Sequence, residues 1–418
     1  MIDLAPIHLV LGPGGAGTST VAAAGAVGLP QHHSGSGRRG KTLLVSLGRF
    51  RDVSAIFGVF ASPGEPVPAS QQVDILELDT LAMVSQMWGS VRSALTAGEL
   101  TGTGVPGAGA VVSGLDPEEI LGMPGVESLL ALRRIRDEAA SGEWAQVVID
   151  MSGGVDPFEL MRVPQMVADM IERLWPRHRR LAAAADNARI ARVVGMVDAL
   201  VRDCADVDEL LFDASGVHVH VVVGVDRDGA SSLDRARAVL QVMGLPVSTI
   251  LANRVLPEML SVDAHTADAP GGSSWLDHQI AAQSAALDHL RATKDEAEVV
   301  CVPWVSGPID SVLSLRKLGV DLSGGQMAAV GPRAARVERE SGAGLDSVYR
   351  MTWTQSLPDP SGLQLGRSGD DLMITVSGVR QRIRLPSVLR RCVVLGAFWD
   401  AGDLTVRFRP DPDVWPQN

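Results

Sequence analysis

Short apolar runs alternate with longer stretches of helical periodicity over the first three quarters of the chain. These runs are Ile7–Leu11, Leu43–Ser46, Val147–Asp150, Val217–Val225, Val247–Ala252 and Val299–Val302. Apolar side chains at nearly every position of a short run are typical of parallel strands that are buried on both faces. Their alternation with helices predicts an α/β fold with a doubly wound, mainly parallel sheet.

Two ranges depart from this rhythm, because residues from about 81–136 and from about 158–211 are mostly helical in pattern. They predict a helical subdomain beside the sheet. Residues 1–320 would then form one large domain. Residues 321–348, rich in Gly, Ala, Arg and Glu, are expected to be a linker, with the charged run Arg333–Glu340 as a solvated helix.

Beyond the linker the pattern is that of short strands. The runs are Gly362–Leu365, Asp371–Val376, Val379–Leu385, Cys392–Trp399 and Leu404–Phe408. Gly378 and Gly402 stand where turns are expected. Short strands joined by glycine turns predict a small β-sandwich over residues 349–418.

Composition narrows the function classes. The chain has 418 residues, of which 46% are hydrophobic and 21% charged, and this balance fits a soluble protein of two domains. Its net charge of -12 argues against a nucleic-acid partner. The N-terminus has no basic region and only a short apolar run, so we expect no signal peptide, no integral membrane segment and a cytoplasmic location.

Residues that often bind metals are sparse and scattered. Cys204, Cys301 and Cys392 are far apart and form no CxxC pair. His218 and His220 share one face of a predicted strand. No third ligand is evident nearby, so we interpret them as part of a solvated or hydrogen-bonded strand face.

A search by letters alone would find a phosphate-binding loop at Gly35–Thr42, which fits G-x-x-x-x-G-K-T. Such a loop must leave a strand and open a helix, so that free amides and the helix dipole meet the phosphate. This segment instead follows a helix and runs into a strand. It is predicted to be a surface turn.

The segment Gly12–Thr20 has the required context, because it follows the first strand and precedes an apolar helix. Its glycines at positions 12, 14, 15 and 17 let the backbone curl with its amides inward. Ser19 lies where a hydroxyl would bind Mg²⁺. A glycine-rich turn without a ligand would have the same pattern, and the loop alone leaves both interpretations open.

The loop reads GPGGAGTST, and it resembles the GKGGVGKTT loop of the ArsA-type arsenical-pump-driving ATPases and the GET-pathway ATPases that target tail-anchored proteins. Pro13 and Thr18 stand where that family has two lysines. The resemblance implies that the first lysine reaches the nucleotide of a dimer partner and that the second contacts the β- and γ-phosphates. This chain lacks both.

Other segments extend the resemblance over nearly the whole chain. Gly48 stands where the family aspartate orients the attacking water, whereas Asp150 of the switch segment is kept. Asn253 and Pro303 match the family residues that contact adenine and line the base pocket. The remaining matches are Met123–Glu127 with a PG-x-E element, Leu385–Pro386, Gly396–Ala397 and Leu404–Phe408 with the α-crystallin-like domain of bacterial members, and the GPGG loop with actinobacterial members.

The resemblance implies ATP or ADP with Mg²⁺ as the ligand. The nucleotide-binding residues would be Gly12, Gly14, Gly15, Gly17, Thr18, Ser19, Thr20, Asn253 and Pro303. Ser19 and Asp150 would hold the metal, and Asp150 is the one candidate catalytic residue. The zinc-binding CxxC pair and the arsenite-binding cysteines of the family are absent, so neither zinc nor arsenite is expected.

The expected function is a nucleotide-binding protein with weak or absent hydrolysis that handles a client or assembles a complex. One alternative is a slow ATPase in which an arginine replaces the lysines, with Arg38, Arg39, Arg49 and Arg51 near in sequence. Another is a non-catalytic scaffold that binds through the β-sandwich.

Partners follow from the same resemblance. The family implies a homodimer, or a heterodimer with an intact paralogue. A hydrophobic helical client is suggested by methionine pairs four residues apart, Met83 with Met87 and Met166 with Met170, and by Met161 and Met196 nearby. Ordinary core packing explains the same spacing.

Overall fold

A computed structural model describes residues 4–29, 40–48, 52–96, 114, 116–121, 123–153, 155–186, 188–213, 216–257, 272–292, 297–323 and 328–415. Contacts divide the chain into two compact units. One comprises Met1–His8, Ala22–Val217 and Ile309–Arg316, and the other Leu9–Val21, His218–Pro308 and Lys317–Asn418. Each unit is described by itself.

The large sheet has the strand order β3-β4-β2-β5-β1-β6-β7-β8. Its strands are β1 (Ile7–Leu11), β2 (Thr42–Ser46), β3 (Val67–Pro68), β4 (Val73–Glu77), β5 (Gln146–Asp150), β6 (Val217–Gly224), β7 (Val247–Val255) and β8 (Glu298–Pro303). β2 pairs in parallel with β4 and β5, and β7 pairs in parallel with β6 and β8. Every residue of β1, β2, β4 and β5 is buried. The prediction of a doubly wound, mainly parallel α/β sheet is confirmed.

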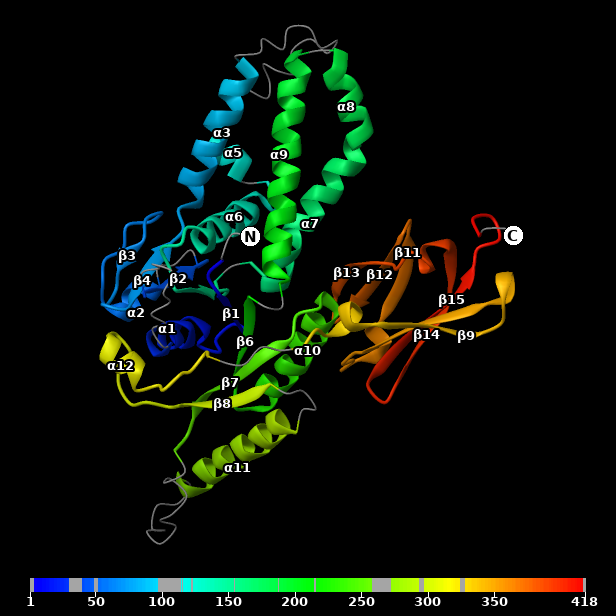
Figure 1. Cartoon of the computed structure of the whole chain (residues 1–418). Helices are drawn as coiled ribbons and strands as arrows, with labels where there is room; N and C mark the ends of the chain where they lie inside the picture. Colours follow the sequence, from blue (N-terminus) through cyan, green and yellow to red (C-terminus); the bar gives the residue numbers. More distant parts are fainter. Residues whose placement is uncertain are drawn as a thin grey trace. The chain divides into compact units, whose positions relative to one another are not determined.

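Helices occupy most of the stretches between the strands, where the apolar residues recur with helical spacing. They are α1 (Thr18–Gly28), α2 (Asp52–Phe57), α3 (Thr80–Thr96), α5 (Pro117–Leu121), α6 (Val126–Ala140), α7 (Pro157–Leu174), α8 (Arg177–Asp186), α9 (Ala188–Leu211), α10 (Arg227–Met243), α11 (Gly272–Arg291) and α12 (Val312–Arg316). Figure 1 shows α7 and α8 beside the long helix α9. The start of α7 is fixed locally, because Asp156 accepts hydrogen bonds from the N–H groups of Phe158 and Glu159 and Pro157 occupies the first helical position.

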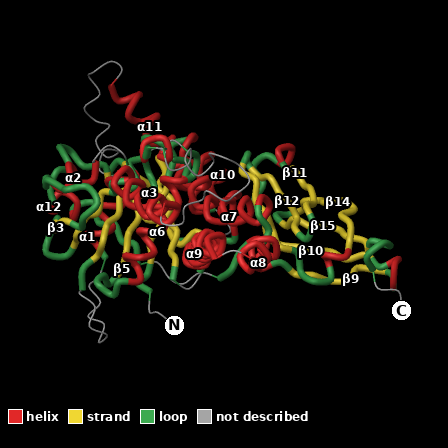
Figure 2. The backbone as a smooth tube through the Cα atoms, turned by 90° about the horizontal axis from the view of Figure 1, so that it is seen from above, coloured by secondary structure: helices red, strands yellow, loops and turns green. Residues whose placement is uncertain are grey.

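The C-terminal strands form two antiparallel sheets. One has the order β14-β15-β10-β9 and the other β11-β12-β13. Their bounds are β9 (Arg336–Ser341), β10 (Val348–Thr354), β11 (Gln364–Ser368), β12 (Asp371–Val376), β13 (Val379–Arg384), β14 (Cys392–Asp400) and β15 (Asp403–Pro410). Figure 2 draws these strands in yellow. Leu404, Val406 and Phe408 alternate inward along β15 and are fully buried, as the predicted β-sandwich requires.

The predicted linker helix at Arg333–Glu340 is wrong. A short 3-10 turn covers Gly331–Ala334, and Arg336–Ser341 forms the edge strand β9, which pairs with β10. The strand is hidden in the sequence because one of its edges and most of its side chains face water, as is usual for a charged edge strand. Its Glu338 forms a 2.7 Å ion pair with Arg350 of β10. Sequence analysis also missed β3, β4 and β10.

Within the second unit, the sandwich packs on α10 through a buried carboxamide. The side-chain Nε2 of Gln355 donates to the Ala238 carbonyl over 2.8 Å, and the N–H of Ser356 donates to Gln241 Oε1 over 2.6 Å. Gly331 approaches the same helix so closely that an added Cβ would lie 1.7 Å from the Gln241 carbonyl oxygen. The sandwich and the turn at Gly331 therefore pack directly against α10.

Candidate functional site

The loop between β1 and α1 curls through its own backbone. The N–H of Ala16 donates to the Pro13 carbonyl over 3.1 Å. Gly15 and Gly17 have φ values of +81° and +84°, a region that favours glycine. Pro13, Gly14 and Gly15 are exposed, and a Cβ added to Gly14 or Gly15 would meet nothing within 4 Å. The crest of the loop is therefore open to a ligand.

Gly12 has a packing role at the base of this loop. A Cβ added there would lie 2.4 Å from the carbonyl oxygen of Val222 on β6 and 2.9 Å from Thr18 Oγ1. Only glycine permits the backbone to pass so close to a neighbouring strand. Gly15 and Gly17 are therefore needed for the conformation of the turn. Gly12 is needed because β6 passes too close for any side chain.

Asn253, near the end of β7, braces the loop from the side. It is buried, and its Nδ2 donates to the Ala16 carbonyl over 2.7 Å while its Oδ1 accepts from the N–H of Arg254 over 2.9 Å. A Cβ on Gly17 would lie 2.5 Å from Asn253 Nδ2. Both ends of the amide are used within the protein, so the adenine contact that the resemblance implies remains a prediction.

The hydroxyl residues at the start of α1 sit at different depths. Thr18, which the resemblance sets against a family lysine, is 4% exposed, whereas Ser19 and Thr20 are half-buried. α1 has no acidic residue in its first turn. The amide dipoles at this helix end therefore meet no opposing carboxylate within the helix, which favours an anion.

Asp150 ends β5 at the carboxyl edge of the sheet. It is 1% exposed, and its Oδ1 accepts from the N–H of Ser152 over 3.1 Å. The register sets Ser46 of β2 level with both Asp150 and Glu77 of β4. Carboxyl edges of parallel strands are where α/β proteins place their functional side chains.

Glu77 at this edge was missed by sequence analysis, because the strand Val73–Glu77 was not recognised. Its side chain accepts from the N–H of Ser54 over 3.2 Å, and it is 4% exposed. Within the described part of the chain its Oε2 has no hydrogen-bond partner. A strand-like VDILE run that ends in an acidic residue was the available signal.

The segments that follow β2 and β5 touch through glycines. A Cβ added to Gly153, whose φ is +101°, would lie 2.7 Å from the Cα of Gly48. A Cβ added to Gly48 would have its nearest neighbour at 3.5 Å, the Oγ of Ser46. Gly153 is thus required by packing, whereas Gly48, which stands for the family aspartate, is not.

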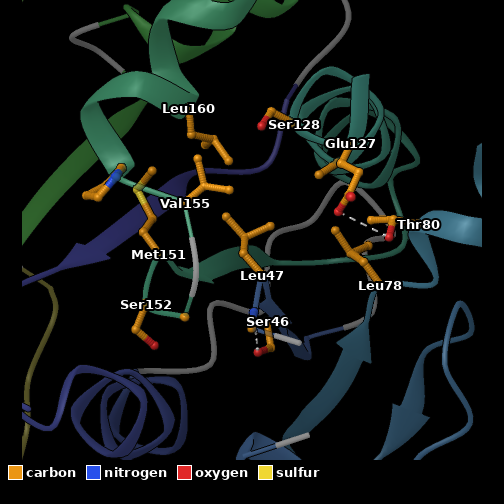
Figure 3. A pocket seen from close by; sticks show the side chains of 14 residues that line it. Ser46, Leu47, Leu78, Thr80, Glu127, Ser128, Met151, Ser152, Val155 and Leu160 are labelled. Atoms are coloured by element: carbon orange, nitrogen blue, oxygen red, sulfur yellow. Dashed lines mark hydrogen bonds between the residues drawn. The ribbon is translucent and has the colours of Figure 1, made fainter. Parts of the chain in front are cut away.

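A small pocket of about 90 Å³ opens between these segments and the starts of α6 and α7. Figure 3 shows Leu47, Met151, Val155 and Leu160 lining it. Its polar lining includes Glu127 and Thr80, whose oxygens are 3.5 Å apart. The pocket is too small for a drug-sized ligand and is mainly apolar.

Few of the other candidate cations can be placed. Lys41, the lysine of the segment Gly35–Thr42, forms a 2.7 Å ion pair with Asp74. Its charge is therefore used within the protein. Arg38, Arg39, Arg49 and Arg51, proposed as replacements for the lysines, lie outside the described residues.

The methionines divide between core and surface. Met83 and Met87 pack against the cluster of Val84, Trp88, Ile120 and Leu130, and Met161 is fully buried. Met166 and Met170 on α7 are 50% and 53% exposed. Core packing therefore explains the first pair, and only the second faces outward.

The remaining candidates give no metal centre in the described residues, where no group of three or more His, Cys, Asp or Glu side chains converges. His220 is buried, and burial lowers the pKa of His218. Burial also raises the pKa of Cys204 and Cys392 to about 11, so these thiols stay protonated at neutral pH. Pro303 ends β8, opposite Val255.

No helix in the described segments combines the length and the apolar character that crossing a bilayer demands.

The family model for anion-transporting ATPases matches residues 6–324, and the model for the HSP20-like domain found in ArsA matches residues 347–408. These matches together cover both parts of the fold.

Three relatives are similar over most of their length. Protein Rv2184c of Mycobacterium tuberculosis is 34% identical over 99% of this chain and 98% of its own, and an uncharacterised protein of Streptomyces coelicolor is 30% identical over 98% of each. A Chlorobaculum tepidum protein is 22% identical over 90% of this chain and 89% of its own, and its provisional name is arsenical pump-driving ATPase.

Proposed function

This chain belongs to the anion-transporting ATPase family, and we propose that it is a nucleotide-binding member that hydrolyses ATP weakly or not at all. The observation that carries the proposal is a loop with open, curled backbone around Gly14 and Gly15 that lacks both lysines. Binding uses backbone amides, and these remain in the loop at every position except Pro13. Phosphoryl transfer needs positioned cations, and Pro13 and Thr18 supply none.

The residues present fit a nucleotide phosphate in this proposal. The crest at Gly14 and Gly15 is unobstructed, and the start of α1 offers amide dipoles without an acidic neighbour in the helix. Ser19 and Asp150 are the hydroxyl and carboxylate proposed for Mg²⁺. Asn253 contributes by holding the loop, and a direct contact with adenine requires one of its two local hydrogen bonds to open.

Client handling is proposed from an exposed apolar row on α7. Met166, Met170 and Leu174 are spaced four residues apart and are 50%, 53% and 77% exposed. Residues with this spacing lie on one helix face, and flexible methionines adapt to varied apolar partners. An amphipathic helix is the proposed client, and the alternative role is assembly of a protein complex.

The hydrolysis part is tested by a turnover assay on the full chain with Mg²⁺ and ATP. We expect release of phosphate at the background rate, unchanged in Asp150→Ala. Turnover comparable with ordinary P-loop ATPases, and lost in Asp150→Ala, would show that the chain is an ATPase with another cation in place of lysine.

The binding part is tested by thermal unfolding with millimolar ATP or ADP and Mg²⁺. A ligand that binds only the folded state raises the melting temperature. Asn253→Ala should reduce the shift, measured against its own ligand-free protein because the variant also loosens the loop. No shift and no calorimetric heat with the unaltered protein would refute nucleotide binding.

The proposed assembly is a dimer, either of two copies or with an intact paralogue. A chain without the family lysine cannot complete a neighbour's site, yet it can receive a lysine from an intact partner. Light scattering with and without nucleotide addresses this point. A strict monomer in both states, and no complex or change in turnover on mixing with a paralogue, would reject it.

A scaffold that binds through the sandwich is the second candidate, and the edge strand β14 favours it. Leu395 and Phe398 of this strand are 48% and 44% exposed. An exposed apolar edge strand is a template for pairing with another chain. Partner capture that persists without nucleotide, and is lost in Phe398→Ser but not in Met170→Ser, would favour the scaffold.

A further inference from the structure

Arg254, near the end of β7, lies in a β-bulge and has a positive φ. The pairing of β7 with β8 shifts register between Asn253 and Val255, so Arg254 is the extra residue of a bulge. Its φ is +63°, in the left-handed region that residues other than glycine rarely adopt. Bulges re-aim side chains and recur beside active sites.

The bulge directs the Arg254 side chain toward the loop that follows β1. Its Nη2 lies 3.8 Å from the position a Cβ would take on Gly17. The preceding residue, Asn253, holds the Ala16 carbonyl at 2.7 Å and accepts from the N–H of Arg254 itself. One short segment therefore both braces the loop and brings a guanidinium to it.

The charge of Arg254 is not neutralised within the described part of the chain. No carboxylate there forms an ion pair with it, and the side chain is exposed. α1 adds no acidic residue in its first turn. A cation and the amide dipoles of a helix start thus lie beside Gly17, two residues beyond the open crest glycine Gly15.

We propose that Arg254 is the cation of the nucleotide loop and that it contacts the phosphate groups of a bound nucleoside di- or triphosphate. This inference rests on the proposed function, because it names the residue that substitutes for the charge that Pro13 and Thr18 lack. A guanidinium suits this task, since its fork of N–H donors matches phosphate oxygens and it stays charged at any physiological pH.

A contact between Arg254 and phosphate predicts an order of affinities that a contact with base or sugar does not. An unpaired guanidinium gains more from each added negative charge, so affinity should rise from AMP to ADP to ATP and should weaken as salt screens the contact. Inorganic tripolyphosphate, which has no base, should compete with ATP. The contact supplies binding and positioning, and no step of hydrolysis is assigned to it.

The test is isothermal titration of the full chain with Mg²⁺ and AMP, ADP, ATP or tripolyphosphate at two salt concentrations. Arg254→Asn removes the charge and keeps a residue type that tolerates positive φ. We expect it to weaken ATP binding about tenfold or more, the scale of a lost charge-assisted hydrogen bond. AMP binding should change least, and the salt dependence should flatten.

Two further variants complete the experiment. Arg254→Lys should recover part of the affinity for ATP, because it restores the charge at the same backbone position. Arg291→Gln, an exposed arginine at the end of α11, should bind as the unaltered protein does. The melting temperature of each ligand-free variant checks that the fold is intact.

The outcomes separate this inference from the function it rests on. If the unaltered protein binds ATP and Arg254→Asn binds it equally well, the role of Arg254 is wrong and nucleotide binding stands. An equal loss for AMP and ATP would assign Arg254 to the base or to loop structure and would also overturn the inference. If the unaltered protein binds neither nucleotide nor tripolyphosphate, both ideas fall.

Discussion

Two buried carboxamides of the second unit can be compared, one at the loop between β1 and α1 and one at the junction of α10 with the sandwich. Asn253 joins the Ala16 carbonyl to the N–H of Arg254. Gln355 joins the Ala238 carbonyl to the indole N–H of Trp353, at 2.8 and 3.2 Å. The first amide braces a loop whose crest is open, whereas the second is itself fully buried and has both ends of its side chain hydrogen-bonded within the protein.

The two regions differ in whether their polar and charged groups have partners within the protein. At the junction the backbone carbonyl of Gln355 also accepts from Trp399 Nε1 over 2.8 Å, and Gln355 is 0% exposed. At the loop, Gly14 and Gly15 are exposed, and Arg254 has no acidic partner in the described residues. Buried polar groups are normally satisfied by the protein itself. The Gln355 amide is therefore satisfied within the protein, whereas the open loop is where we propose that a ligand binds.

The largest expected effect concerns the junction. In Gly331→Ala the new Cβ would lie 1.7 Å from the Gln241 carbonyl oxygen, so the backbone of α10 or of the turn has to move. We expect a loss of at least about 3 kcal/mol in the free energy of unfolding, measured by denaturant titration. Gly344→Ala is the matched control, because its φ of +58° is similar and nothing lies within 4 Å. Equal losses would show that the junction is loosely packed.

The second prediction concerns the side-chain amide of Gln355. Gln355→Glu replaces a donor that faces the carbonyls of Ala238 and Ser356 with an acceptor in a buried site. We expect a loss of about 2–4 kcal/mol in the free energy of unfolding. Gln364→Glu, on an exposed position of β11, should change it little. A tolerated Gln355→Glu would mean that the sandwich can separate from α10 at small cost.

A smaller effect is expected at the loop between β1 and α1. Gly17→Ala would place its Cβ 2.5 Å from Asn253 Nδ2, whereas Gly15→Ala has nothing within 4 Å although both glycines have φ above +80°. Displacing the amide breaks its bond to Ala16, and we expect Gly17→Ala to cost about 1–2 kcal/mol more than Gly15→Ala. Thermal unfolding without ligand measures the difference. If the two variants are equally stable, Asn253 is not a brace.

The smallest effect concerns β6, the strand that contacts the loop at Val222 and leads into α10. Burial lowers the pKa of His218, so the folded protein prefers the neutral ring. As pH falls through the ordinary histidine range, the unfolded chain takes up a proton that the folded chain resists, and stability decreases. The loss ends once pH is below the folded pKa. His218→Gln should flatten this dependence in unfolding measured from pH 7 to 5, and His178→Gln, exposed on α8, should not.

The sequence by itself determined the elements whose signal is local. Apolar runs such as Ile7–Leu11 predicted buried parallel strands, because a strand with both faces covered needs an apolar residue at nearly every position. The strand-to-helix context singled out Gly12–Thr20 over Gly35–Thr42. Family motifs then predicted the fold and the HSP20-like domain, both of which are confirmed.

The tertiary structure decided everything that depends on residues distant in the chain. β9 is a strand only because β10 supplies its hydrogen bonds, and Gln355 matters only because α10 lies against it. Met87 packs against a core cluster and Met170 is 53% exposed, although both have the same spacing pattern. The sequence assigns no role to Arg254, the residue after Asn253. Only the bulge in β7 brings it near Gly17, because backbone geometry imposed by long-range pairing sets the direction of a side chain.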